Sequence, residues 1–405
     1  MEHKFLFRYR LWIFFLVAVI LVVFLSFTKK ELSASPLTKE AEKFVSLCAN
    51  EESRPLCYDR EIPKLMDRGF TMEETFTVTT IIQGIDPSYH YCHVLGHRLA
   101  EKETAKDPSK WIEVVHRAPQ GVCSNGGIHG AFQERFRTES MPEAKIEELK
   151  PILSGVCQRS SDWNPTRMGQ ATCTHALGHL AMYVTAANTP KSLEICDDSA
   201  LNEGGYDFRQ LCYDGVFMQT YQPLEPEDYT LIEGKEVTKA TRDAFCASYS
   251  GKRKSSCISE SWPLYNKEIK TASGAETFCS GAPDTRERNR CLRGVFYVVT
   301  EQMHFAEKDI SNYCAGFSLV DRNLCFANAA SRMIETDWRN IERSVQLCEL
   351  SRDYGAETGC YDELVIFSTY NFPPESAESA KLCSLLPSPW KEKCDERRQS
   401  AIRSV

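Results

Sequence analysis

The spacing of the cysteines constrains this fold more than any other sequence feature. The chain has 405 residues and 18 cysteines, and sixteen of the cysteines form eight couples whose members lie 9 to 16 positions apart. Disulfides persist in oxidising compartments, whereas structural zinc sites favour Cys-x2–4-Cys spacing, which no couple shows. We therefore predict a chain outside the cytoplasm and eight local disulfides: Cys48/Cys57, Cys157/Cys173, Cys196/Cys212, Cys246/Cys257, Cys279/Cys291, Cys314/Cys325, Cys348/Cys360 and Cys383/Cys394.

The second cysteines of the last five couples reveal a repeat. Cys257, Cys291, Cys325, Cys360 and Cys394 follow one another at intervals of 34, 34, 35 and 34 residues. A fixed period of this length indicates stacked supersecondary units. Helix-like runs follow these cysteines, and acidic or proline start signals then open a second helix. The predicted fold is all-α: a solenoid of helical hairpins, each joined to the next by a disulfide.

This period and cysteine placement resemble the secreted, cysteine-rich Sel1-like helical repeat proteins. In that family a disulfide also joins the end of one helix to the start of the next. The resemblance covers roughly residues 41–405. The glycine-rich turn typical of Sel1-like units is not evident, and the Trp-Leu-Gly-Tyr pattern of tetratricopeptide repeats is missing. The resemblance implies the architecture and a concave surface that binds a partner, and it assigns no functional residue.

The N-terminus departs from this pattern. Residues 11–27 form an unbroken apolar run, with basic residues at Lys4, Arg8 and Arg10 before it. This length is at the short end for a membrane-spanning helix and long for the apolar part of a signal peptide. We predict an uncleaved signal anchor, and a cleaved signal peptide is the alternative. Basic residues in the short tail favour a cytoplasmic N-terminus.

The predicted organisation follows from this anchor. Residues 1–10 form a cytoplasmic tail, 11–27 a transmembrane signal anchor, 28–40 a linker and 41–405 a helical repeat domain. The predicted localisation is the cell membrane, single-pass, with the main domain on the extracytoplasmic side.

Cys92 and Cys123 have no partner at short range. Corresponding positions in adjacent repeats are expected about 10 Å apart, because packed helix axes are 8–10 Å apart, and this is too far for a disulfide. The small residues Gly96, Gly126 and Gly127 would permit a closer approach. We predict a ninth disulfide, because an unpaired thiol outside the cytoplasm is a liability. Thiolate metal ligands and a redox-active pair are the alternatives.

Near copies of one motif place histidines in pairs. Cys92-His-Val-Leu-Gly-His97 and Cys173-Thr-His-Ala-Leu-Gly-His179 each hold two histidines four residues apart, which share one face of a helix. The looser copy Cys123-Ser-Asn-Gly-Gly-Ile-His129 supplies one more. Three neighbouring helices at about 90–183 would then point imidazoles in one direction; alternatively, these are ordinary packed or solvated residues. The candidate metal ligands are His93, His97, Glu101, His129, His175 and His179, with Glu101 as a further ligand or base.

Glycines recur three to five residues after a cysteine in these predicted helices. A glycine inside a helix costs about 1 kcal/mol relative to alanine, so each position needs a physical reason. We expect adjacent helices to approach closely there; room for a ligand against the backbone is the alternative. The positions are Gly96, Gly127, Gly178, Gly215 and Gly294.

Composition and motifs narrow the function classes. The net charge of −8 argues against a nucleic-acid surface. The motifs of zinc proteases, haem attachment, phosphate-binding loops, dinucleotide sites and serine hydrolases are absent. One predicted function is a membrane-anchored binding or assembly scaffold for a protein partner. The alternative is a metal- or haem-binding protein, up to a metalloenzyme, that uses the histidine cluster of residues 93–179. Imidazole suits zinc, iron and copper alike, so the residue type leaves the metal open.

Overall fold

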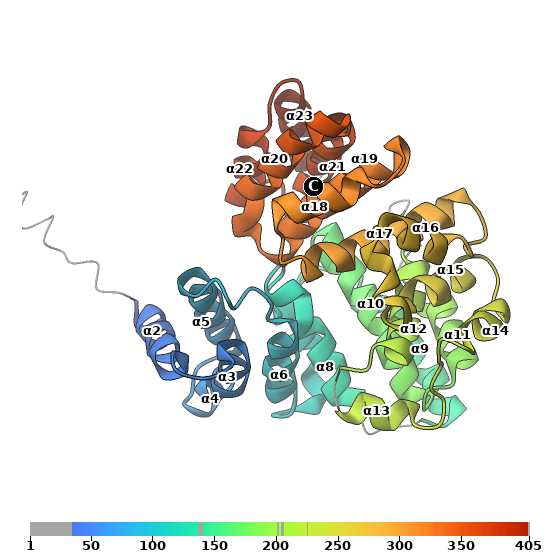
Figure 1. Ribbon diagram of the computed structural model, residues 1–405. Coiled ribbons are helices and arrows are strands. Elements are labelled where there is room, and N and C mark those ends of the chain that lie inside the picture. Colours follow the sequence, from blue (N-terminus) through green and yellow to red (C-terminus); the bar gives the residue numbers. More distant parts are fainter. Residues whose placement is uncertain (1–34, 137–140, 201, 204–205, 225, 404–405) are drawn as a thin grey trace, which may run out of the picture.

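A computed structural model describes residues 35–136, 141–200, 202–203, 206–224 and 226–403. Over these residues the chain is all-α, as predicted, apart from a small antiparallel hairpin of β1 (Asn202–Glu203) and β2 (Tyr206–Asp207). The N-terminal helices α2 to α5 lie to one side of the molecule (Figure 1). Their bounds are α2 (Pro36–Cys48), α3 (Arg54–Glu61), α4 (Lys64–Asp67) and α5 (Met72–Ile85).

Within the described part of the chain, nine helices form a row in which each packs on the next. They are α6 (His93–Thr104), α8 (Gly126–Phe136), α10 (Arg167–Val184), α12 (Arg209–Tyr221), α15 (Gly251–Glu260), α17 (Thr285–Gln302), α19 (Leu319–Thr336), α21 (Glu357–Tyr370) and α23 (Trp390–Arg403). Helix starts follow capping chemistry: the side chains of Thr166, Asp284 and Ser318 accept hydrogen bonds from backbone N–H groups three residues on. These bonds satisfy N–H groups that have no partner inside the helix.

A second set of helices lies between the row helices in the sequence. They are α7 (Trp111–Arg117), α9 (Glu143–Val156), α11 (Thr189–Ser199), α13 (Pro226–Ile232), α14 (Arg242–Ala247), α16 (Ala272–Cys279), α18 (Glu307–Ala315), α20 (Ile341–Leu350) and α22 (Ala377–Leu385). Short 3-10 helices complete the connections: η1 (Pro108–Lys110), η2 (Cys123–Asn125), η3 (Trp262–Tyr265), η4 (Glu268–Lys270), η5 (Trp338–Asn340) and η6 (Ser351–Tyr354).

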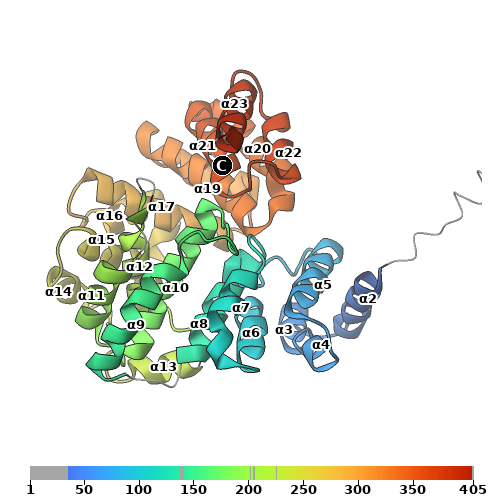
Figure 2. The ribbon, with the colours of Figure 1, turned by 180° about the vertical axis from the view of Figure 1, so that it is seen from behind.

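The later part of the row folds back toward its beginning. Helix α21 contacts α10, and η2 contacts α19. The guanidinium of Arg339 also donates a hydrogen bond to the carbonyl of Thr80. Seen from behind, the C-terminal helices α19 to α23 stand above α8 and α10 (Figure 2). Groups from α17 and α19 therefore come close to the histidine-bearing helices.

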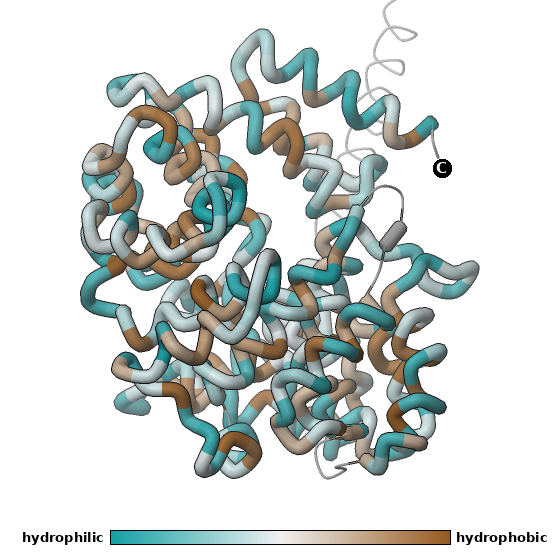
Figure 3. Tube along the Cα trace, turned by 90° about the vertical axis from the view of Figure 1, so that its right-hand side faces the viewer, coloured by the Kyte–Doolittle hydropathy of each residue, from teal (hydrophilic) through white to brown (hydrophobic). Residues whose placement is uncertain are grey.

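The apolar faces of the helices meet in one continuous core. Apolar and polar segments intermix along each helix of the tube drawn in Figure 3, as expected for helices buried on one face. The core runs from Ala41 in α2 to Cys394 in α23 and includes all eighteen half-cystines. The disulfides are therefore part of the buried interior rather than surface links.

Nine disulfides pair all eighteen cysteines. The eight local bridges are those that the spacing predicts. The ninth joins Cys92 to Cys123, whose Cα atoms are 4.8 Å apart, so these two sulfur atoms are not thiolate ligands. No cysteine is left free among the described residues.

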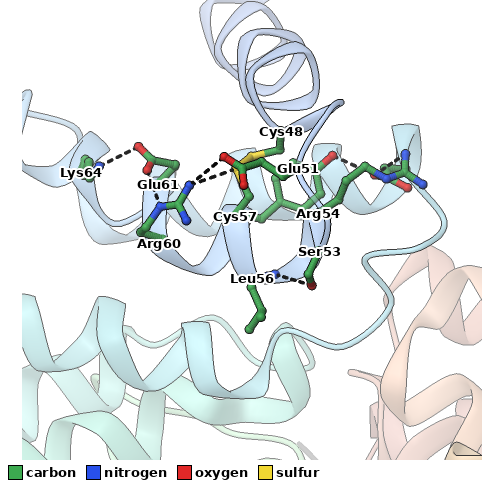
Figure 4. Close-up of a disulfide and its surroundings, with 11 residues drawn as sticks. Cys48, Glu51, Ser53, Arg54, Leu56, Cys57, Arg60, Glu61 and Lys64 are labelled. Carbon is green, nitrogen blue, oxygen red and sulfur yellow. Dashed lines mark hydrogen bonds and ion pairs between the residues drawn. A yellow bond between two sulfur atoms is a disulfide. The ribbon is translucent and has the colours of Figure 1, made fainter.

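The Cys48–Cys57 bridge shows how a local disulfide closes a turn between two helices (Figure 4). Ser53 caps α3 by accepting a hydrogen bond from the backbone N–H of Leu56. Next to the sulfur atoms, the Arg60 guanidinium pairs with Glu51 at 3.3 Å and with Glu61 at 2.8 Å. The covalent link and the helix cap thus act on the same short connection.

The predicted localisation needs correction. In the described ranges, none of the helices combines the length and the apolar character that crossing a bilayer demands. The single-pass membrane localisation is therefore not supported, and we withdraw it. The tail, the anchor at 11–27 and the first part of the linker lie outside the described residues.

Candidate metal centre

His93 and His97 form the first histidine pair of the site. Both lie on α6 four residues apart, so they project from one face of the helix. Their Nε2 atoms are 3.1 Å apart, and their residues are only 7% and 5% exposed. Two imidazoles thus converge on one buried point, as the spacing predicted.

His175 and His179 repeat this arrangement on α10. Their Nε2 atoms are 3.2 Å apart, and both side chains are half-buried. The pair faces the first across α8, which packs between α6 and α10.

His129 on α8 occupies the centre of the cluster. Its ring centroid is 5.0 Å from that of His93 and 5.4 Å from that of His97. It is also 5.6 Å from that of His175 and 5.3 Å from that of His179. The residue is 8% exposed, and its Nε2 atom has no hydrogen-bond partner among the described residues. A buried nitrogen without a partner is costly, and a bound cation would satisfy it.

Three of the predicted ligands come together most tightly. Three ligand nitrogens lie within 4.8 Å of one another, one each from His93, His97 and His129. All three residues are buried. This group can hold a metal ion. Glu101, one turn beyond His97 on α6, does not belong to this group, and its role as a ligand or base stays a prediction.

Glycines explain how backbones carrying these histidines come so close. A Cβ atom added to Gly130 would lie well under 3.0 Å from the carbonyl oxygen of His97, and one added to Gly178 equally close to that of Cys212. Gly215 meets the carbonyl of His175 in the same way. These positions are direct backbone contacts between neighbouring row helices. The close-approach interpretation is confirmed at the predicted positions Gly178 and Gly215, whereas Gly127 and Gly294 meet side chains.

Replacing these glycines is expected to push the histidine helices apart. We predict that Gly130→Ala and Gly178→Ala each lower the free energy of unfolding by about 1–3 kcal/mol, the usual cost of overpacking, and weaken metal binding. Gly155→Ala in α9 is the matched control, because a Cβ there meets nothing within 4 Å. It should be neutral or stabilising by up to about 1 kcal/mol. Denaturant unfolding with the disulfides intact measures all three; equal effects at positions 130 and 155 would contradict the explanation.

Backbone and amide groups behind the histidines orient the rings. The Nδ1 atom of His93 lies 3.3 Å from the carbonyl oxygen of Cys123, and the backbone of Leu211 hydrogen-bonds His175. The Nδ1 atom of His179 lies 2.7 Å from Oε1 of Gln219. Such partners typically hold a metal-binding imidazole with its other nitrogen facing the ion.

Burial keeps the imidazoles neutral. It lowers the pKa of His93 to about 4, although the hydrogen bond to Cys123 acts in the opposite direction. Burial also lowers the pKa of His129 and His175 well below the ordinary value, and neighbouring histidines add to the effect. The pKa of His179 is lowered by burial too, while Gln219 and Asp228 oppose the shift. Neutral imidazoles at pH 7 are the form that binds metal ions.

A small cavity opens between these side chains. Its volume is about 20 Å³, and polar lining comes from Gln133, Tyr183, Gln219, Gln222 and Asp228. This is room for one water molecule or ion, and the haem alternative stays a prediction. The Tyr183 hydroxyl donates to the carboxylate of Asp228, a residue that is 5% exposed.

Sequence reasoning missed the partners that come from distant helices. Gln219 and Leu211 lie on α12, and Asp228 lies on α13. From α19, the Arg332 guanidinium lowers the pKa of His93 and is itself paired with Glu301 at 2.5 Å. The sequence offered one indication of these partners. Cys212 stands at the start of a repeat equivalent to those with histidines, so the residues after it are expected to face the histidine cluster.

Comparisons with protein-family models, with curated proteins and with solved structures found no match for this chain.

Proposed function

We propose that this protein binds a divalent transition-metal ion through His93, His97 and His129. The observation that carries the proposal is the convergence of three buried imidazole nitrogens within 4.8 Å. Ligands bound at about 2.0–2.1 Å to a tetrahedral ion stand about 3.3 Å apart, close to the 3.1 Å between the Nε2 atoms of His93 and His97. The spacing of the apo pair is thus already near that of a chelate.

The ligand chemistry favours zinc, iron, copper or nickel. An all-imidazole set suits these ions and not the oxygen-seeking magnesium or calcium. Three protein ligands would leave a fourth position for a bound water, and Gln133 and Gln222 line the cavity next to these histidines. A metal ion there would lower the pKa of that water, while the surrounding amides orient it.

Zinc titration of the chelator-washed protein with intact disulfides tests this proposal. We expect zinc to raise the free energy of unfolding, by about 4 kcal/mol at a thousand times the dissociation constant. His129→Gln should weaken zinc binding by more than about 100-fold, because loss of a supporting group alone costs 10–100-fold. His90→Gln, in ring contact with His304 outside the cluster, is the control and should bind as the wild type does. Equal binding by both variants would refute the site.

The helices beyond the histidine units support a second, broader proposal. From α12 to α23 each helix of the row packs on the next, and a disulfide enters each row helix. This order is what a curved array of helical hairpins requires. The role as a scaffold for a protein partner stays a prediction. It is compatible with a metal site at one end of the array.

A further inference from the structure

The two histidine pairs are near copies of one another in structure as well as in sequence. Each pair stands at positions i and i+4 of a row helix, with Nε2 atoms 3.1 and 3.2 Å apart. In each pair the first histidine is hydrogen-bonded to the backbone of the next row unit, His93 to Cys123 and His175 to Leu211. The second pair therefore shares the nitrogen spacing and the backbone support of the first.

We infer that the cluster is built for two metal ions, one held by His93 and His97 and the other by His175 and His179, with His129 between them. This inference rests on the proposed function and extends it from one divalent ion to a pair. The ligand class is the same for both positions: a first-row divalent ion that prefers imidazole nitrogen, such as Zn²⁺.

One tetrahedral ion cannot use all five imidazoles, because zinc takes four ligands. The ring of His129 lies between the pairs, with centroid distances of 5.0 to 5.6 Å to all four partners. Among the residues that the structure describes, only the first pair and His129 bring three ligand nitrogens within 4.8 Å of one another. The second pair has the same nitrogen spacing as the first and lies beside it, and His179 lines the same small cavity as His93 and His97.

Carboxylates and guanidinium groups both act on the two histidine pairs. The carboxylate of Glu301 acts on His93, and the carboxylate of Asp228 acts on His179. Each pair therefore has an acidic group on its own side. Arg332 is ion-paired with Glu301 and Glu335, and its effect on His93 is larger than that of Glu301.

Glycines bring the backbones together on both sides of the cluster. Gly126 and Gly130 of α8 lie against the carbonyls of His93 and His97, and Gly215 of α12 lies against that of His175. The same packing device is thus found beside both pairs, with two glycines at the first and one at the second.

The number of zinc ions per chain decides the question. Native mass spectrometry of the chelator-washed, disulfide-intact protein loaded with Zn²⁺ alone should find two tightly held ions. His97→Gln and His179→Gln should each retain one, and His90→Gln should retain two. A variant that lacks all four paired histidines measures the number of zinc ions bound elsewhere on the surface. This number is subtracted from each of the other counts. The four are His93, His97, His175 and His179.

The possible results separate this inference from the metal-binding proposal. One ion in the wild type overturns the inference and leaves the proposed function intact, whereas no ion overturns both. If His97→Gln and His179→Gln each abolish all binding, the five histidines form one joint site, and the inference is again wrong. The wild-type count needs no substitution and so stands even where a variant fails to fold.

Discussion

Removing the Cys92–Cys123 disulfide should destabilise this protein more than removing any of its other bridges. The cysteines are 31 residues apart in the sequence, and closing a loop of this length contributes about 4 kcal/mol in the chain-entropy model. The bridge also holds the start of α6 against η2, where the Cys123 carbonyl faces the His93 ring. We expect a variant with alanine at both positions to lose about 4 kcal/mol in the free energy of unfolding and to bind zinc more weakly.

The Cys383–Cys394 bridge provides the matched control. Its cysteines are 11 residues apart, so its removal is expected to cost about 3 kcal/mol in the same model. It joins α22 and α23 at the far end of the row, away from the histidines. Zinc binding should therefore survive its removal. Unchanged zinc affinity without the Cys92–Cys123 bridge would show that this bridge stabilises the fold and does not position the site.

Acid should destabilise the metal-free protein through the buried histidines. The pKa of His93 is about 4 in the folded chain against 6.5 in an unfolded one. Above pH 6.5 both states are neutral. As the pH falls from 6.5 toward 4, only the unfolded state takes up this proton, so the folded state loses stability. The difference between these two pKa values corresponds to about 3 kcal/mol for His93 alone.

Other groups titrate in the same range, so the prediction is a difference between two proteins. Burial raises the pKa of Glu260 to about 8, and this group stabilises the folded state as the pH falls, opposite in sign to His93. Comparing wild type with His93→Gln cancels that contribution. We expect the stability of the wild type relative to the variant to fall by about 3 kcal/mol between pH 6.5 and pH 4, measured by denaturant unfolding with chelator present. Parallel pH profiles would mean that His93 is not kept neutral by burial.

Local spacing accounts for what could be predicted of the fold. Cysteines 9 to 16 residues apart meet across the connection between consecutive helices, so pairing them required no knowledge of how distant helices pack. The helical period likewise placed His93 with His97 and His175 with His179. The sequence could not decide whether Cys92 reaches Cys123, because that depends on how closely two helices approach.

The sequence by itself determined the all-α class, the local disulfides and the direction in which each histidine pair projects from its own helix. These follow from contacts between residues near in the chain, whose geometry the helical period sets. Only the tertiary structure decided that His129 stands between the pairs, that Gln219 and Asp228 reach His179, and that Glu301 comes near His93. Those contacts depend on how far one helix is rotated and shifted against the next. Here the glycines of α8 and α12 determine how the neighbouring helices are placed, because they let one backbone pack directly on another.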